Sequence, residues 1–469
     1  MLTKLDLGHN QLSTLPPELP TSLQTLSCLD NAFETVPPAV AALTQLRMLS
    51  FESCRLRDLG AAPLPASVVW LILTSNKLTS LPESIGQLTG MRKLMLANNH
   101  LAALPDAMGA MKELELLRIS NNEFGSFPPW LYYSLPKLSW LAIAANPAVL
   151  PAPSRAALDA VSYDELSFGP ELSSELGPEL GEGSSSSVVR RGGWHGQAVA
   201  IKVYKAPLSS DGRSVDEVRA SCAVDHPNVL RWLTYLEEGG AAQEASATAP
   251  ASGTWRLVGV LEWAPGFRSL GKPPSMATIT RDTYPPQTHL TAAEVRTIAH
   301  DIASALEHLH SRGVAHGDLY AHNILWRRQA DETVQPSHRH HHPRDTEGEV
   351  AVLPGLATAT LSVKLSVKLS GFGAAFYYGP AHTHSDPIAA ERAAAYERME
   401  QRAFGLLLEE LLEHHEGDSE AESLYAVREA AALATAAPDQ RPGFGALVQL
   451  LHRRGRYRPH RLHRFQSGE

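Results

Sequence analysis

The sequence has few cysteines and no long apolar run. Its 469 residues include only three cysteines, Cys28, Cys54 and Cys222, too few for a disulfide framework. No stretch reaches the roughly 18 consecutive apolar residues of a membrane span. The first residues, MLTKLDLGHN, contain neither the basic nor the apolar region of a signal peptide. These absences favour a cytoplasmic protein without a membrane span.

The chain also lacks a basic excess. Its formal net charge is -9, whereas general nucleic-acid binders are basic, so we expect no nucleic-acid partner. The one basic run leads into the C-terminal tail, residues 456–469; a solvated tail is the favoured interpretation, and a docking tail for an anionic partner is the alternative. Apolar residues make up 43% of the chain, which is typical of a globular protein.

Residues 1–150 contain an internal repeat. Seven segments fit the pattern L-x-x-L-x-L-x-x-N/C-x-L at spacings of 21 to 24 residues; they begin at Leu2, Leu23, Leu46, Val68, Met91, Leu114 and Leu138. Seven copies in register resemble the leucine-rich-repeat family. Because each unit buries its face only against neighbours, an array needs capped ends. No polar cap precedes Leu2, so we expect the natural protein to start earlier.

Three sets of repeat positions have a physical interpretation. A buried asparagine column should satisfy the backbone of the turns, with Cys54 in that column in the third copy; its members are Asn10, Asn31, Asn76, Asn99, Asn122 and Asn146. Prolines such as Pro37, Pro82 and Pro105 should lie on the convex side. A protein ligand is expected on the concave face, with a spacer or scaffold role as the alternative. The solvent-facing positions of that face should be Asp6, Ser27, Ser50, Ile72, Met95, Arg118 and Ala142.

The remainder of the chain contains a glycine-rich segment followed by a lysine. Gly181, Gly183 and Val188 fit G-x-G-x-x-G-x-V, with Ser186 in place of the third glycine, and VAIK ends at Lys202. Much farther on, HGDLYAHN carries Asp318 and Asn323 at the spacing of H-R-D-x-x-x-x-N. These motifs, in this order, resemble a protein kinase over about residues 176–455.

The kinase resemblance implies roles for particular residues. Lys202 would bind the α- and β-phosphates of ATP, oriented by Glu217, while Asp318 would accept the substrate's hydroxyl proton and Asn323 would bind magnesium. The segment RLVGVLEWAP resembles the hinge, where Glu262 and Ala264 would offer backbone groups to adenine. The substrate would be a protein.

Several departures from the kinase pattern point to an alternative. Gly371 stands where the D-F-G motif has its metal-binding aspartate, Gly317 replaces the arginine of H-R-D, and no A-P-E follows. Glu400 resembles the acidic residue of the large C-lobe helix, and Arg441 resembles the late-lobe arginine, with Glu391 or Glu397 as its partner. The chain is therefore either an ATP-dependent protein kinase with a weakened magnesium site, or a pseudokinase scaffold that binds nucleotide and partners.

The predicted organisation has two folded parts. The fold class is an α/β leucine-rich-repeat solenoid, residues 1–150, plus an α+β two-lobed protein-kinase-like domain, residues 176–455. A linker spans residues 151–175, and low-complexity insertions lie near 239–253 and 327–360. The second insertion is histidine-rich; disorder is favoured over a metal site there, which would use His338, His340, His341 and His342. Because the linker has few apolar residues, we expect the two parts to unfold separately.

Overall fold

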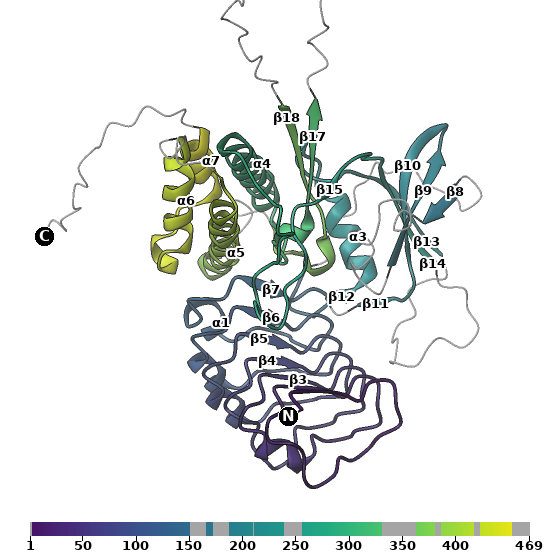
Figure 1. Cartoon of the computed structure of the whole chain (residues 1–469), viewed down its shortest axis with the longest axis vertical. Helices are drawn as coiled ribbons and strands as arrows, with labels where there is room; N and C mark the ends of the chain where they lie inside the picture. Colours follow the sequence, from purple (N-terminus) through teal and green to yellow (C-terminus); the bar gives the residue numbers. More distant parts are fainter. Residues whose placement is uncertain are drawn as a thin grey trace, which may run out of the picture.

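The computed structural model describes residues 2–150, 166–171, 187–209, 211–238, 256–330, 363–379, 386–416 and 423–452. Figure 1 shows the repeat array at one end of the molecule and the kinase-like part resting on it. Gly181, Gly183, the histidine-rich insertion and the basic tail lie outside the described residues.

The repeats form one parallel sheet of seven strands in sequence order. Each strand has three residues, and the middle residue of each is the apolar one that the repeat pattern directs into the array. The strands are β1 (Lys4–Asp6), β2 (Thr25–Ser27), β3 (Met48–Ser50), β4 (Trp70–Ile72), β5 (Lys93–Met95), β6 (Leu116–Arg118) and β7 (Trp140–Ala142).

The convex side consists of short helices that begin directly after prolines. Three 3-10 helices follow Pro37, Pro82 and Pro105, whose fixed φ suits the first position before a helix. They are η1 (Pro38–Ala42), η2 (Glu83–Gln87) and η3 (Asp106–Ala110), and the last repeat has the short helix α1 (Trp130–Tyr133). The predicted convex prolines are therefore confirmed.

The asparagine column forms a hydrogen-bond ladder between repeats. The Asn122 amide nitrogen donates to three backbone carbonyls, and its oxygen accepts from the Leu101 N–H at 3.0 Å. The residue before each column position has a positive φ, as at Asn121, so the turn presents its carbonyls to the amide. Asn10 is the exception: it is exposed, because its strand lies at the edge of the sheet.

This ladder predicts a graded effect of removing asparagines. Asn122→Ala should lower the free energy of unfolding by about 2–4 kcal/mol, because it leaves several buried backbone groups without partners. Asn10→Ala, at the exposed position, is the matched control and should cost below about 1 kcal/mol. Urea unfolding followed by circular dichroism measures both; equal losses would contradict the proposed role of burial.

The first lobe of the kinase-like part is a five-stranded antiparallel sheet with one helix. Its strand order is β13-β14-β10-β9-β8, and Lys202 lies on β10. The helix α3 (Ser214–Cys222) packs beside the sheet (Figure 1). The strands are β8 (Ser167–Glu171), β9 (Ser187–Trp194), β10 (Gln197–Tyr204), β13 (Trp232–Glu238) and β14 (Arg256–Glu262). The short hairpin β11 (Leu208–Ser209) and β12 (Gly212–Arg213) precedes α3.

The predicted linker extends too far into this lobe. Residues 167–171 form the edge strand β8, which pairs with β9, and Leu166 is buried among the apolar residues of the sheet. The structural boundary of the kinase-like part therefore lies near Leu166 rather than at residue 176. The linker lacks a helical or alternating pattern, so its sequence did not indicate this strand.

The second lobe is helical. Its four helices are α4 (Ala292–Ser311), α5 (Pro387–Glu413), α6 (Tyr425–Thr435) and α7 (Phe444–His452). Between α4 and α5 lie two pairs of strands. The short strands β16 (Val314–Ala315) and β19 (Phe376–Tyr377) pair with each other, and β17 (Ile324–Ala330) pairs with β18 (Val363–Leu369). The strand β17 also pairs with β15 (Arg268–Ser269). The helix η5 (Ala321–Asn323) ends the catalytic-loop segment.

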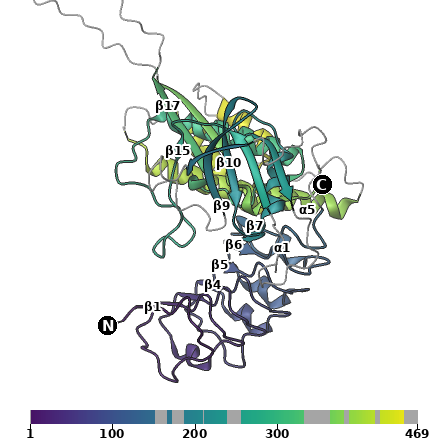
Figure 2. The same cartoon turned by 90° about the vertical axis from the view of Figure 1, so that its right-hand side faces the viewer.

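The concave face of the array packs against the kinase-like part, which Figure 2 shows from the side. Four of its apolar side chains belong to the same buried cluster as α4 and α5: Ile72, Met95, Leu116 and Trp140. The expectation that the concave positions face solvent is therefore wrong for Ser50, Ile72, Met95 and Ala142, which are buried, while Asp6 stays exposed. A second cluster likewise joins the array's core to Phe376 and Tyr396. A shared core contradicts the weak coupling from which separate unfolding was predicted.

Candidate functional site

Lys202 and Glu217 form an ion pair. Lys202 lies near the end of β10, and Glu217 lies in the first turns of α3; the Lys202 Nζ and Glu217 Oε1 atoms are 2.5 Å apart. Only 16% of the lysine side chain and 11% of the glutamate side chain are exposed. Because a mostly buried pair of this kind holds the ammonium in one place, the geometry suits a lysine that meets a phosphate.

The loop from His316 to Asn323 is fixed by hydrogen bonds from its own backbone. Glu400 of α5 accepts from the His316 N–H at 3.2 Å and from the Gly317 N–H at 2.8 Å. Its carboxylate also lies 2.7 Å from His310 Nε2. Burial alone would raise the pKa of Glu400, but these partners outweigh burial and lower it. Glu400 therefore anchors the loop to the large helix, as its resemblance implied.

Asp318 has both carboxylate oxygens engaged. Its Oδ2 accepts from Asn323 Nδ2 at 3.0 Å, and its Oδ1 accepts from Arg118 Nη2 at 2.9 Å. Burial alone would raise the pKa of Asp318, but the charge of Arg118, followed by those of His322 and His316, lowers it. Asp318 is thus an ionised carboxylate at the centre of the loop. The closest cation in these contacts comes from the repeat array.

Gly371 has a left-handed backbone, with φ of +77°. A Cβ added there would lie 2.2 Å from Asn323 Oδ1, so the Asn323 amide occupies the space of a side chain at position 371. Asn323 Nδ2 meanwhile donates to the Asp318 carbonyl at 2.8 Å. Neither residue offers the acidic oxygen that a magnesium ion prefers.

The magnesium that the resemblance implies does not fit these residues. The one predicted ligand, Asn323, donates to Asp318 with its Nδ2, and position 371 is a glycine without the carboxylate of the kinase pattern. Among the described residues, no group of three or more histidine, cysteine or acidic side chains could hold a metal ion. Asn323 is thus the one predicted metal ligand present, and its Oδ1 faces Gly371.

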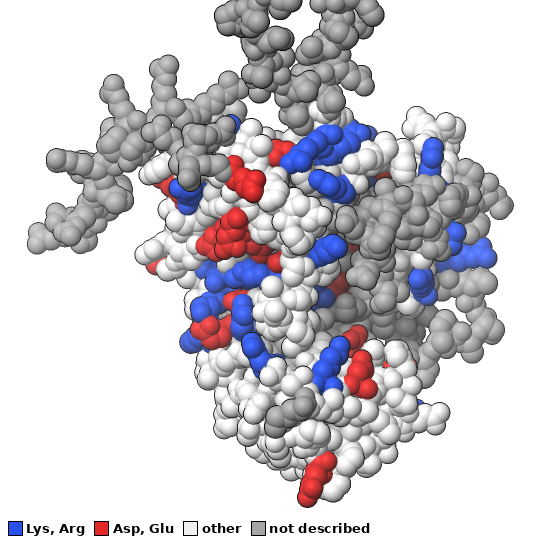
Figure 3. Space-filling view, in the orientation of Figure 1, with Lys and Arg blue, Asp and Glu red and all other residues white. Residues whose placement is uncertain are grey.

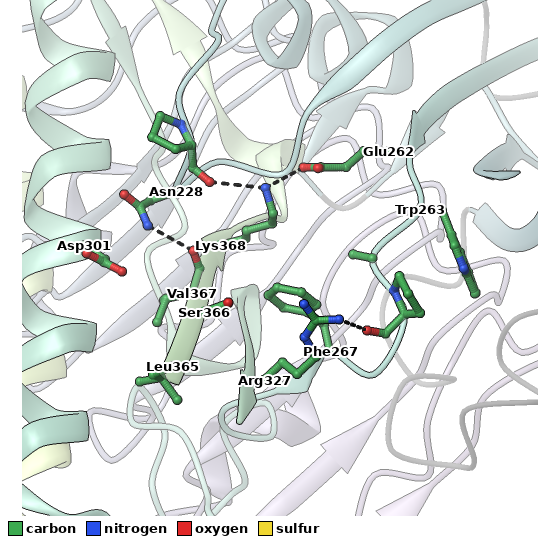
Figure 4. Close-up of a pocket in the computed structure, with 13 residues that line it drawn as sticks. Asn228, Glu262, Trp263, Phe267, Asp301, Arg327, Leu365, Ser366, Val367 and Lys368 are labelled. Atoms are coloured by element: carbon green, nitrogen blue, oxygen red, sulfur yellow. Dashed lines mark hydrogen bonds and ion pairs between the residues drawn. The ribbon is translucent and has the colours of Figure 1, made fainter. Parts of the chain in front are cut away.

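The predicted hinge residues line a cavity of about 350 Å³. Glu262 and Ala264 lie on its wall, and Lys368 Nζ reaches Glu262 Oε1 at 2.7 Å (Figure 4). The Glu262 N–H already donates to the Arg231 carbonyl. The Ala264 carbonyl accepts from the Phe267 N–H at 3.4 Å, so the Glu262 carbonyl and the Ala264 N–H are the hinge groups considered for an adenine. Lys202 and Asp318 are not part of this wall.

Comparisons with known proteins agree with both halves of this architecture. The protein kinase domain family matches residues 174–336, and leucine-rich-repeat families match residues 66–124 and 1–23. The chain is a leucine-rich-repeat protein with a protein-kinase domain.

Each of the following relatives resembles one half of this chain. Dual specificity testis-specific protein kinase 1 of Homo sapiens is 32% identical over 152 residues, 32% of this chain and 20% of that protein. Podocan-like protein 1 of Mus musculus is 38% identical over 95 residues, 19% of this chain and 17% of that protein. The chain thus spans about a fifth or less of the length of these two relatives.

Solved structures of leucine-rich-repeat proteins are also similar to part of this chain. A leucine-rich-repeat protein of Leptospira interrogans matches with 30% sequence identity and a TM-score of 0.26, over 31% of this chain and 44% of that chain.

Among the residues near the catalytic loop that were not predicted are Arg118 and Asp211. Arg118 of β6 was singled out only as a concave position, and Asp211, in the turn between β11 and β12, had no recognised motif. The Arg118 guanidinium contacts Asp211 with one nitrogen and Asp318 with the other. The one available signal was that Arg118 is the only basic residue among the seven concave positions.

The predicted partner of Arg441 is wrong. Arg441 donates to the backbone carbonyls of Ala436, Arg398 and Pro136. Glu397 instead accepts from the Phe444 N–H at 2.9 Å. Pro136 belongs to the last repeat, so Arg441 links the kinase domain to the array instead of pairing with a glutamate.

Charge on the outer surface is mixed. On the face in Figure 3, the acidic and basic side chains of the described residues are interspersed rather than gathered into one basic field. Among the described helices, none combines the length and the apolarity that crossing a bilayer requires.

Proposed function

We propose that this leucine-rich-repeat kinase binds ATP and transfers its γ-phosphoryl group to a hydroxyl of a protein substrate. The observation that carries the proposal is the mostly buried ion pair of Lys202 and Glu217. An ammonium fixed in this way is prepared for the charge of a nucleotide's phosphates. Asp318, ionised and hydrogen-bonded to Asn323, supplies a carboxylate that can accept the proton of the attacking hydroxyl.

The nucleotide would lie over the sheet of the first lobe. Gly181 and Gly183 would allow the backbone to approach the phosphates, and Val188 of β9, which pairs with Val203, would cover the adenine. The backbone of Glu262 and Ala264 would hold the base. Transfer should be slow, because Gly371 leaves the γ-phosphate charge poorly neutralised.

A pseudokinase is the second candidate, and one contact favours it. The Asn323 amide fills the space beside Gly371, so the chain lacks both the metal-binding carboxylate and an open position for it. In that case the kinase fold would bind nucleotide and partners and signal by its shape.

Single-turnover phosphorylation of dephosphorylated casein separates these functions. The full chain should transfer phosphate slowly but measurably, and Asp318→Asn should reduce the rate at least about 100-fold, the usual size of a general-base contribution. Asp225→Asn, at an exposed aspartate of the same domain, is the matched control and should retain the rate. Equal rates for Asp318→Asn and the parent would remove Asp318 as base. ATP binding without transfer in any variant would favour the pseudokinase.

The array and the cysteines indicate the partner and the compartment of this activity. Leucine-rich repeats generally bind proteins, so we propose a protein ligand on the concave face, in addition to the protein substrate. All three cysteines are buried as thiols, which suits the reducing cytoplasm.

A further inference from the structure

The repeat array touches the kinase domain at its proposed catalytic base. We infer that the array is an intramolecular inhibitor of the kinase domain. Its concave face covers the catalytic loop, and Arg118 forms an ion pair with Asp318. This inference rests on the proposed function, since it assigns a regulation to the same site.

The first support is electrostatic. The Arg118 side chain is only 13% exposed, and its two terminal nitrogens are divided between Asp211 and Asp318. Asp318 accepts from Asn323 with its other oxygen, so both carboxylate oxygens have a partner, and a substrate hydroxyl would have to compete with Arg118 for Oδ1.

The second support is steric. The Trp140 ring of β7 stacks on Tyr320, with centroids 4.4 Å apart and planes 5° from parallel, and its Nε1 donates to the Leu319 carbonyl at 2.8 Å. Leu319 and Tyr320 directly follow Asp318. A substrate hydroxyl has to come within hydrogen-bond distance of Asp318, and the last two repeat strands contact this loop through Arg118 of β6 and Trp140 of β7.

The third support is the unusual residue at position 317. Gly317 has φ of +75°, and an added Cβ would lie 2.6 Å from the Leu141 carbonyl oxygen of β7 and 2.7 Å from that of Ala374. The arginine that the kinase resemblance leads one to expect here would collide with the array. A glycine at position 317, in place of the arginine of H-R-D, therefore leaves the room that the docked repeats need.

The fourth support is reciprocal charge pairing. Glu115 of the array, which is buried, accepts hydrogen bonds from Thr280 and from Arg281 of the kinase domain. The array therefore contributes Arg118 to Asp318 of the kinase domain, and the kinase domain contributes Arg281 to Glu115 of the array. A buried ion pair adds little net stability, because its charged groups lose their hydration on docking and regain it on separation. Its main effect is to fix how the two surfaces align when they dock. The contact is suited to a docking that can be released.

Release would uncover the apolar strip of Ile72, Met95, Leu116 and Trp140 with Arg118 beside it. A protein ligand on the concave face and the kinase domain therefore compete for one surface. A ligand with an acidic side chain among apolar ones would match it.

The test compares Arg118→Gln with the parent, both as full chains, and Arg47→Gln serves as control because Arg47 is exposed on the third repeat. Hydrogen exchange of residues 314–323 is measured by mass spectrometry, and single-turnover phosphorylation of dephosphorylated casein is measured beside it. We expect exchange to rise about tenfold or more in Arg118→Gln, since removing one partner of a buried charge pair destabilises the docked state. Phosphorylation should rise with it.

Each outcome decides one of the two claims. Exchange in Arg118→Gln equal to that of Arg47→Gln overturns the inhibition, whatever the phosphorylation rate. Raised exchange without phosphorylation in any variant supports the docking and overturns the kinase activity. Asp211→Asn weakens the same guanidinium contact from the kinase side, and it must shift exchange in the same direction even if Arg118→Gln fails to fold.

Discussion

Replacing Lys202 with methionine should lower the affinity for ATP at least about tenfold. The side chain provides the one cation that lies against Glu217 at 2.5 Å, and without it the phosphates would face an uncompensated carboxylate. Opposite charges at about 4 Å near a protein surface interact by about 4 kcal/mol at an effective dielectric constant of 20, so even partial screening leaves a tenfold effect. Isothermal titration calorimetry with ATP measures the loss.

Lys205→Met is the matched control for this experiment. Lys205 follows directly after β10 and is exposed, so its removal should leave the affinity unchanged within about twofold. If Lys202→Met and the parent bind ATP equally well, the proposed nucleotide site is wrong, because no other role of the ion pair predicts a nucleotide dependence.

Replacing Trp140 with alanine should lower the free energy of unfolding by about 3–5 kcal/mol, the usual cost of removing a buried aromatic side chain. Trp140 is 2% exposed, stacks on Tyr320, and gives its indole N–H to the Leu319 carbonyl. Because this side chain belongs to the array but packs in the kinase core, its loss should destabilise both halves together. Denaturant unfolding, followed by tryptophan fluorescence and circular dichroism, measures the change.

The control here is Tyr133→Ala, which removes an aromatic ring from the same array at a side chain that is 53% exposed. It should change stability by less than about 0.5 kcal/mol. Two separate transitions in the parent, with only one of them shifted by Trp140→Ala, would show that the halves unfold independently. The shared apolar clusters would then contribute little to their coupling.

Much of the fold could be predicted because its determinants are local. The repeat period sets one strand for each copy, and the prolines mark where convex helices begin. The order and spacing of VAIK and HGDLYAHN indicated the kinase fold, since phosphate binding and proton transfer need particular side chains at fixed separations. The structure brings Lys202 to Glu217 and Asp318 to Asn323, although their catalytic roles stay predictions.

Other features could not be predicted because they depend on contacts between residues far apart in the sequence. The concave positions carry no charge or aromatic stripe, and a repeat pattern distinguishes inward from outward positions without showing what covers the outward face. Arg118 and Asp318 are 200 residues apart. No spacing rule relates positions so far apart, so the sequence indicated an open ligand surface where the structure has a docked domain.

The sequence by itself determined that this protein has a leucine-rich-repeat half and a protein-kinase half, and that position 371 lacks a carboxylate. These properties depend on which side chains follow one another and at what period. Tertiary structure alone decided that the array covers the catalytic loop, that Arg118 pairs with Asp318, and that Asn323 fills the space beside Gly371. The reason is physical: burial and charge pairing depend on the complementary shape of two folded surfaces, and that shape exists only after each half has folded.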